Sequence, residues 1–213
     1  MTSVHPIRLV SWDIDGTLYS ISRMKWHLMR MFLSETTRGR ALSAGKELSA
    51  LKRYRSQIDA ARSTGGALNE FFLRQKCGEA IPGIEKRWYG RAIQKTGLRR
   101  SVLDVITLLA AKGIPQVVLS DYEGAYKLDS LGLTSQFASI YVGVRLGFVK
   151  PSPFSFRRAA ADYEIPTASL LHIGDRVDRD KAAARVAGCQ CLILGDDFRS
   201  FDALMDRLRS ING

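Results

Sequence analysis

The sequence has few cysteines, and their spacing excludes two common kinds of stabilising site. Only Cys77, Cys189 and Cys191 occur among 213 residues, and no two of them have the Cys-x-x-Cys spacing. An odd count without that spacing predicts neither a disulfide framework nor a zinc site. Cys189 and Cys191 alternate along a predicted strand, so we expect small core residues. A reduced, cytoplasmic location agrees with this cysteine usage.

Long apolar runs are also missing. No stretch approaches the roughly 20 apolar residues that span a bilayer, and no apolar run follows Met1 as it would in a secretory signal. We therefore expect no membrane partner. Hydrophobic residues still make up 46% of the chain, which is ordinary for a globular protein. The length suits one sizeable domain, or a core domain with a smaller insertion.

Acidic residues are scarce in one segment. Between residues 19 and 100 there are 18 Lys and Arg but only six Asp and Glu, a balance of +12 within a chain whose net charge is +11. A basic surface attracts anions such as phosphorylated metabolites, nucleic acids or acidic lipids. A solvated, arginine-rich helical surface explains the charge equally well. The sequence leaves these alternatives open, and it leaves the oligomeric state open.

Strand and helix patterns alternate through most of the chain. Short apolar runs bounded by Gly or Asp predict five buried strands, and they lie at residues 7–12, 114–119, 139–142, 170–173 and 190–194. Helical patterns that alternate with these strands lie at residues 101–112, 152–163, 180–187 and 198–211. Ser101 and Asp104 resemble a capping box, so we expect Ser101 to cap the first of these helices. This alternation predicts an α/β fold, a Rossmann-like parallel five-stranded sheet with helices on both faces.

One stretch interrupts this alternation with helices alone. Its patterns predict helices at about residues 22–34, 41–61, 68–77 and 84–95. Gly65-Gly66 and Ile81-Pro82-Gly83 are the expected breaks. We therefore predict an α/β core domain formed by residues 1–19 and 99–213, with an inserted all-helical cap domain at residues 20–98. The predicted cap is the segment that carries the positive charge.

The strongest candidate for chemistry follows the first strand. Asp13-Ile14-Asp15-Gly16-Thr17 places two carboxylates where a buried run enters a glycine turn, at the sheet edge where parallel sheets bind ligands. One carboxylate can attack an electrophile and share a metal while the other transfers protons. A simple Asx turn would explain one Asp and the Gly, but not the buried run that leads into Asp13.

A second acidic motif follows the fourth predicted strand. It contains Asp175, Asp178 and Asp180 after Gly174. Magnesium prefers oxygen ligands, so a carboxylate here that faces Asp13 would complete a magnesium site. The alternative is that acidic residues favour the N-terminus of the next helix, an interpretation that suits Asp178 better than Asp180.

Two further polar residues end predicted segments at the same edge. Ser120 follows a buried run and is able to donate a hydrogen bond to a phosphoryl oxygen, although such serines are usually turn or cap residues. Lys150, in Lys150-Pro151, would offset the charge of crowded carboxylates and a phosphate. Each signal is weak when taken alone.

Taken together, these motifs resemble those of the haloacid dehalogenase-like (HAD) superfamily. Their order and spacing match its four motifs, here Asp13-Ile-Asp-Gly-Thr-Leu18, Ser120, Lys150-Pro151 and Gly174-Asp175 with Asp180. The resemblance covers the strand-and-helix core. A helical insertion between the first and second motifs is similar to that superfamily's type 1 cap.

The resemblance implies a magnesium-dependent phosphatase, a hydrolase of phosphoric monoesters. Asp13 would be the nucleophile that forms an aspartyl-phosphate. Asp15 would protonate the leaving oxygen and then activate water, while Ser120 and Lys150 would hold the phosphoryl oxygens. These roles agree with the chemistry, because phosphoryl transfer depends mainly on positioning and charge neutralisation. The substrate that we expect is a small anionic phosphorylated metabolite.

The implied metal site contains Mg²⁺ held by Asp13, the backbone carbonyl of Asp15, and Asp175. Asp180 would support the ion directly or through water. The resemblance leaves open a phosphomutase of the same superfamily. A nucleic-acid-binding or anion-binding protein on a HAD-like core is the alternative that the charged segment suggests, and we favour it less because every motif residue is present.

Two positions depart from the family pattern. Trp12 stands where Phe is usual, which is expected to be a packing variant. Asp121 follows Ser120 where Asn is common. Because its carboxylate would repel a phosphate, we expect Asp121 to turn away and cap a helix that starts near Tyr122.

Overall fold

A parallel five-stranded sheet forms the centre of the protein in the computed structural model, which describes residues 5–63, 68 and 80–209. The strand order is β3-β2-β1-β4-β5, and every neighbouring pair is parallel. The strands are β1 (Leu9–Trp12), β2 (Gln116–Ser120), β3 (Ser139–Val142), β4 (Leu170–Gly174) and β5 (Gln190–Ile193). The predicted α/β fold is confirmed, and each strand lies within or next to its predicted range.

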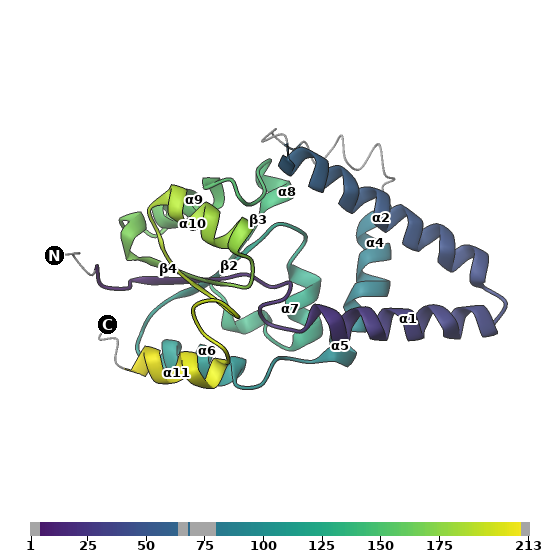
Figure 1. Cartoon of the computed structure of the whole chain (residues 1–213), viewed down its shortest axis with the longest axis horizontal. Helices are drawn as coiled ribbons and strands as arrows, with labels where there is room; N and C mark the ends of the chain where they lie inside the picture. The colour runs from purple at the N-terminus through teal and green to yellow at the C-terminus, as the bar shows by residue number, and fades with distance from the viewer. Residues whose placement is uncertain (1–4, 64–67, 69–79, 210–213) are drawn as a thin grey trace.

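Helices cover both faces of the sheet (Figure 1). One face packs against α9 (Phe154–Asp162) and α10 (Ala182–Ala187), and the other against α6 (Val102–Ala111) and α11 (Phe201–Arg209). Leu9 belongs to the buried cluster formed with α9 and α10, and its neighbour Val10 belongs to the cluster formed with α6 and α11. Because side chains alternate across a strand, this continuous apolar run fills both interfaces.

The remaining elements of the core are short. They are α7 (Ala125–Leu131), the 3-10 helix η2 (Thr134–Gln136), α8 (Gly143–Leu146), the 3-10 helix η3 (Thr167–Ser169) and the π-helix η4 (Val177–Lys181). The predicted helix at 180–187 therefore begins earlier, in a π-helical turn that carries the second acidic motif. Ser101, expected to cap α6, has a left-handed backbone (φ +60°) and instead donates its hydroxyl to Asp202 at 2.7 Å.

The stretch between β1 and α6 contains helices joined by turns, and no strand is named among its described residues. Its elements are α1 (Ile21–Thr37), α2 (Ala41–Ser63), α4 (Ile81–Glu85), the π-helix η1 (Lys86–Gly90) and α5 (Arg91–Thr96). The predicted break at Ile81-Pro82-Gly83 is wrong, because proline is tolerated in a first helical turn that has no amide partner to lose. The predicted helix at 68–77, the Gly65-Gly66 break and Cys77 lie outside the described residues, apart from Leu68.

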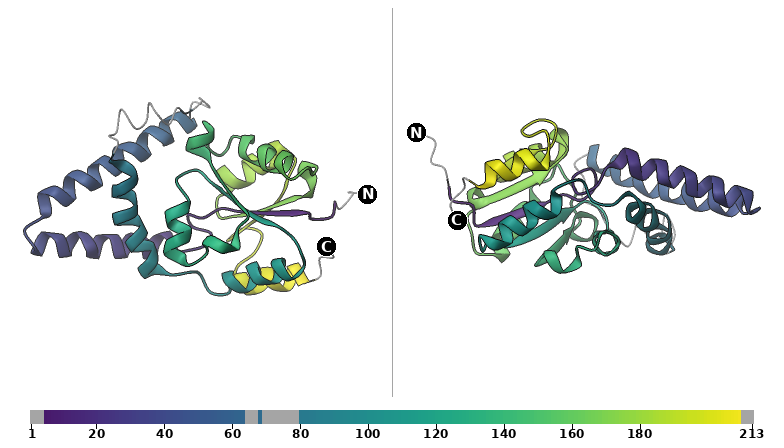
Figure 2. Two further views of the ribbon diagram at one scale, coloured as in Figure 1. Left: turned by 180° about the vertical axis from the view of Figure 1, so that it is seen from behind. Right: turned by 90° about the horizontal axis from the view of Figure 1, so that it is seen from below.

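These inserted helices lie beyond the carboxyl ends of the strands. α1 leads away from the sheet and α2 returns towards it, so the two helices form a V whose arms meet at the end farthest from the sheet, and α4, η1 and α5 lie between the open arms (Figures 1 and 2). Met24, Ile58 and Ile93 from the insertion belong to the same buried cluster as Val10 of the sheet. The apolar interior is therefore continuous, and the division into core and cap at residues 19/20 and 98/99 stays a prediction.

Two features bear on the expectations drawn from composition. Cys189 and Cys191 are free thiols at β5, and both pack, partly buried, against the sheet-α9-α10 cluster. Across the described ranges, no helix combines the length and apolar character that crossing a membrane requires.

Candidate active site

Three carboxylates meet at the carboxyl edge of the sheet. Asp13 follows β1, and its amide donates to the carbonyl of Ile173 in the neighbouring strand β4 at 2.9 Å. Asp175 follows β4, and Asp180 lies in η4. Oxygen atoms of Asp13, Asp175 and Asp180 all lie within 4.8 Å of one another. The structure thus brings together side chains that the strand-end argument expected to meet.

Lys150 lies inside this carboxylate cluster. Its side chain is 3% exposed, and its Nζ lies 2.6 Å from Asp13 Oδ1 and 2.7 Å from Asp180 Oδ1. Nζ also donates to the carbonyl of Leu119 at 3.1 Å. Burial by itself disfavours the charged amine, but Asp13 and Asp180 raise the pKa of Lys150 well above its ordinary value. Lys150 is therefore a fixed cation between two carboxylates.

Asp13 is held at both of its carboxylate oxygens. Lys150 contacts Oδ1, and the hydroxyl of Thr17 donates to Oδ2 at 3.3 Å. Burial raises the pKa of Asp13, Lys150 opposes that shift, and Asp180 and Asp175 add to it. Sequence reasoning gave Thr17 no role. The site holds Asp13 in a fixed orientation but carries more negative charge than Lys150 offsets.

Asp180 is the most firmly held of the three. Its Oδ2 accepts from the backbone amides of Asp175 (3.2 Å) and Arg176 (3.0 Å), and its Oδ1 lies 3.2 Å from His172 Nε2. Burial opposes its ionisation, yet Lys150 and His172 keep the pKa of Asp180 well below its usual range. It is a permanent anion at the base of the cluster.

Asp178 lies outside this cluster, as expected. Its side chain is exposed, and both of its oxygens accept from Arg176 at 2.9 Å. Although it belongs to the same acidic motif, it points to solvent and makes a surface ion pair.

Asp175 leaves one oxygen without a partner. Its Oδ1 is buried and has no hydrogen bond among the described residues. Burial and then Asp180 raise the pKa of Asp175 to about 6. A buried polar atom without a partner is costly, and hard oxygen ligands are what Mg²⁺ binds. The donor set and this unpaired oxygen therefore fit a divalent cation held by Asp13, Asp175 and Asp180.

The side chain of Asp15 lies apart from the three-carboxylate cluster. Its Oδ1 accepts from the hydroxyl of Tyr19, and its Oδ2 lies 2.5 Å from Nζ of Lys127, a fully buried residue of α7. Burial opposes ionisation, but Lys127 and Arg55 lower the pKa of Asp15 below its ordinary value. Asp15 is thus an ionised carboxylate with its own cations. The predicted use of its backbone carbonyl as a metal ligand stays a prediction.

Arg55 of α2 reaches this second acidic position from the insertion. Its guanidinium carbon lies 4.2 Å from the ring centroid of Tyr89 and 4.7 Å from that of Tyr122, so two aromatic faces hold it. Sequence reasoning missed Arg55, Lys127 and Tyr19. No motif marks Arg55 and Lys127, since their contacts depend on how α2 and α7 pack over the strand ends. The contact of Tyr19 is local, four residues after Asp15.

The expectation for Asp121 is wrong. Asp121 does not cap a helix at Tyr122, because α7 begins at Ala125. The amides at the start of that helix, those of Gly124 and Ala125, donate to the carboxylate of Glu123. Instead Asp121 accepts from the backbone amide of Lys150 and from Nη2 of Arg62, both at 2.8 Å. Arg62, on α2, is the reason: it supplies a cation that the sequence gave no means of placing beside Asp121.

The space that these residues enclose is small. It measures about 40 Å³, far below the roughly 300 Å³ at which small-molecule sites begin. The lining residues are Asp13, Asp15, Asp121, Tyr122, Lys150, Asp175, Arg176, Arg179 and Asp180. Ser120 is buried at the end of β2 and is not among them, so its predicted contact with a phosphate stays a prediction.

Comparisons with known proteins agree with this arrangement. A chain from Neisseria gonorrhoeae called phosphoglycolate phosphatase is 38% identical over 87 residues, which are 39% of this chain and 36% of that protein. The Neisseria meningitidis protein of the same name is 37% identical over 87 residues, covering 39% of this chain and 37% of that one. The match thus spans little more than a third of the length of these curated relatives.

Solved structures show the same fold. The hydrolase YfnB of Bacillus subtilis superposes with a TM-score of 0.69 at 18% identity, covering 96% of this chain and all of that one. A 2-haloacid dehalogenase from Pseudomonas syringae has a TM-score of 0.65 at 20% identity, covering 95% and 98%. A family model described as haloacid dehalogenase-like hydrolase matches residues 7–188. With that match over most of its length, the chain belongs to the haloacid dehalogenase-like hydrolases.

Proposed function

We propose that this hydrolase is a magnesium-dependent phosphatase that removes the phosphoryl group from a small phosphorylated metabolite, with Asp13 as the nucleophile. One observation carries the proposal. Asp13 is buried at a strand end and lies 2.6 Å from the Lys150 amine, and one of its carboxylate oxygens lies within 4.8 Å of oxygens of Asp175 and Asp180. The partial match to two phosphoglycolate phosphatases supports phosphate-ester chemistry.

The metal would be held by Asp13, Asp175 and Asp180, with the carbonyl of Asp15. The unpaired Oδ1 of Asp175 supports this assignment, and the Bacillus subtilis neighbour was solved bound to magnesium. When bound, Mg²⁺ would neutralise charge so that an anionic carboxylate can approach an anionic phosphate. Lys150 places a second positive charge beside the carboxylate of Asp13.

The residues divide the proposed reaction into two displacements. In the first, a carboxylate oxygen of Asp13 bonds to phosphorus, the bond to the ester oxygen breaks, and that oxygen takes a proton from Asp15. Because Asp15 is ionised in the closed site, it must first take up that proton from solvent while the site is open. In the second, Asp15 takes a proton from water as the water oxygen bonds to phosphorus and Asp13 is released. Lys127 and Tyr19 hold Asp15 in the ionised form that the second displacement uses.

Substrate entry requires movement of the inserted helices. A space of about 40 Å³ is too small for a phosphomonoester, and α2 closes it through Arg62, which donates to the carbonyl of Lys150 at 2.7 Å. Separation of α2 from the loop at Asp121 would open the site, as lids do in other enzymes. Arg179 lines the same space and is placed to meet a second anionic group on a small substrate.

The test is phosphate release from a panel of small phosphomonoesters, with phosphoglycolate included, in the presence and absence of magnesium. We expect Asp13→Asn to lower kcat at least about a thousandfold, as loss of a nucleophile does. Asp178→Asn is the matched control, because it makes the same change at an exposed residue of the acidic motif. Parent-like turnover by Asp13→Asn, or parent turnover without any divalent cation, would refute the proposal. Release of inorganic phosphate, in place of an isomerised ester, separates hydrolysis from phosphomutase activity.

A further inference from the structure

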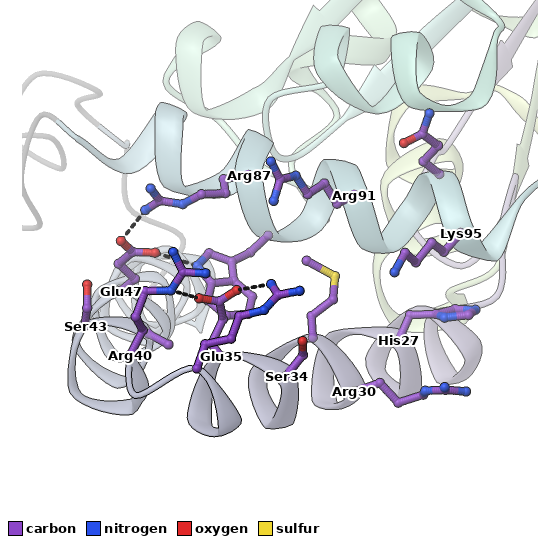
Figure 3. A pocket seen from close by; sticks show the side chains of 15 residues that line it. His27, Arg30, Ser34, Glu35, Arg40, Ser43, Glu47, Arg87, Arg91 and Lys95 are labelled. Carbon is purple, nitrogen blue, oxygen red and sulfur yellow. Dashed lines mark hydrogen bonds and ion pairs between the residues drawn. The ribbon is translucent and has the colours of Figure 1, made fainter.

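A second and much larger cavity lies within the inserted helices. It measures about 860 Å³ and is bounded by α1, α2 and the η1–α5 segment (Figure 3). This volume is in the range of small-molecule sites. The cavity shares no lining residue with the carboxylate cavity at the strand ends. It is therefore a separate feature of the insertion that the proposed hydrolysis does not use.

Cations line both walls of this cavity. Arg87, Arg91 and Lys95 follow one another at four-residue spacing along η1 and α5, which places them on one helical face. His27 and Arg30 of α1 lie on the opposite wall, as Figure 3 shows. Like charges at this spacing repel one another, so the arrangement costs free energy unless an anion offsets it.

The acidic side chains of the cavity are already occupied. Glu35 pairs with Arg38 at 3.3 Å and Arg40 at 2.8 Å. Glu47 pairs with Arg87 and accepts from Nε1 of Trp88 at 2.6 Å.

The cations nearer α5 lack such partners. In the part of the chain that the structure describes, Arg91 and Lys95 make no ion pair, and Arg30 lies 4.7 Å over the ring of Trp26. Burial first, and then Lys95 and Arg30, lower the pKa of His27. Positive charge is therefore left uncompensated at this end of the cavity.

We propose that this cavity binds a small ligand carrying two or more phosphate groups, at a site separate from the one that hydrolyses the substrate. Six lining residues are Arg or Lys and two are Glu, a net charge of +4, so a single phosphate of charge about −2 would leave about half of it unbalanced. A small ligand is favoured over nucleic acid because the cations face one another across a bounded cavity (Figure 3), whereas backbone binding uses charges spread along an open groove.

Methylenediphosphonate is the probe, because its P–C–P bond resists hydrolysis. Binding is measured by calorimetry, and His27 is followed by NMR, which is practical because the chain has three histidines. The test variant is Arg91→Ala with Lys95→Ala, both at exposed helical positions that suit alanine. The control is Lys52→Ala with Arg53→Ala, which removes the same charges from exposed positions of α2 that do not line this cavity.

We expect the parent to bind methylenediphosphonate at least tenfold more tightly than inorganic phosphate, with a rise in the pKa of His27. The Arg91/Lys95 variant should lose at least tenfold in affinity and show no His27 response, while the control stays within about twofold. Equal losses in both variants, or no His27 response in the parent, would overturn the proposal.

Two more measurements separate this site from its alternatives. Phosphate release by the Arg91/Lys95 variant should match the parent. If the variant loses both phosphate release and probe binding, these residues belong to the substrate site and the proposal of a separate site is wrong. The second measurement is the binding of a single-stranded oligonucleotide. Binding that is tighter than that of the probe, that depends steeply on salt and that weakens equally in both variants would overturn the small-ligand assignment in favour of nucleic acid.

Discussion

At the scale of single residues, the pairing of Asp15 with Lys127 is the contact that most affects the proposed chemistry. Lys127 is completely buried, and its amine lies 2.5 Å from the carboxylate of Asp15. Removing one partner of a buried pair leaves the other charge uncompensated. The carboxylate would retain its contacts with Tyr19 and Arg55 but lose the group that fixes Oδ2. Lys127 is therefore a positioning residue for the proposed acid and base.

Lys127→Met should lower kcat for phosphate release by about ten- to a hundredfold, because a misplaced acid-base group loses part of its usual contribution. The measurement is steady-state hydrolysis with magnesium, alongside circular dichroism to confirm the fold. Lys112→Met is the control, since that lysine precedes β2 at the opposite edge of the sheet. Equal kcat for Lys127→Met and the parent would show that Asp15 does not depend on this lysine.

The candidate site could be predicted from sequence where strand ends determine it or where a motif of the family marks it, as at Lys150 and Asp180. Asp13 and Asp175 follow apolar runs, and the parallel order brings the ends of those runs together. Lys127 contacts Asp15 across 112 residues of sequence, and Arg62 contacts Asp121 across 59. These contacts depend on helix packing, which leaves no local pattern, so sequence reasoning missed them.

At the scale of elements, the turn after β1 determines whether the carboxylates can meet. Gly16 has φ +99°, and a Cβ placed there would lie 2.0 Å from Asp175 Oδ2. The turn therefore needs glycine for two reasons, a backbone conformation that other residues rarely adopt and a close approach to a carboxylate. Gly195, after β5, has a similar φ of +92° but nothing within 4 Å. Substitution of Gly195 therefore tests the backbone strain alone, whereas substitution of Gly16 tests the strain together with the contact with Asp175.

Gly195→Ala should lower the free energy of unfolding by about 1 to 3 kcal/mol through backbone strain and keep hydrolysis near the parent level. Gly16→Ala should lose similar stability and, in addition, at least about tenfold in kcat, because Asp175 must move away from Asp13. Urea unfolding and phosphate release measure the two effects. Parent-like kcat for Gly16→Ala would contradict the role given to this turn.

Element types were more predictable than element boundaries. The five strands and the helices α1, α2, α6 and α9 lie close to their predicted ranges. Continuous apolar runs mark the strands, and a clear apolar periodicity marks α1, α6 and α9 but not α2. Ser101 fails as a cap because its hydroxyl is used by Asp202 of α11, a distant partner. The π-helical turns at 86–90 and 177–181 depend on local packing that periodicity does not encode.

At the scale of the whole molecule, α2 connects the insertion to the core through Arg62. This side chain donates to the carbonyl of Lys150 at 2.7 Å and to Asp121 at 2.8 Å. A second link nearby is the amide of Leu68, which donates to the carbonyl of Gly147 at 2.7 Å. Lys150 also pairs with Asp13. Arg62 therefore links α2, the helix that covers the carboxylates, to a residue at the centre of the site.

Arg62→Ala should lower the free energy of unfolding by about 1 to 3 kcal/mol, since it leaves a carboxylate and a carbonyl with fewer partners. For a chain of this length that is about 2 to 4 °C in Tm for each kcal/mol. Arg53→Ala on the same helix should change stability by less than about 0.5 kcal/mol, because the guanidinium of Arg53 donates to exposed Ser49 and to no other described side chain. Thermal melts of both variants test this, and equal shifts would refute the special role of Arg62.

One helix takes part in both cavities. α2 contributes Glu47 to the wall of the cationic cavity and Arg62 to the cover of the carboxylates. At about 1.5 Å per residue, these positions are about 22 Å apart along a continuous α-helix. Such a helix tilts as a stiff rod. If the Arg62 end of α2 swings outward to admit an ester, the Glu47 end therefore shifts relative to α1 and α5, unless these two helices move together with α2.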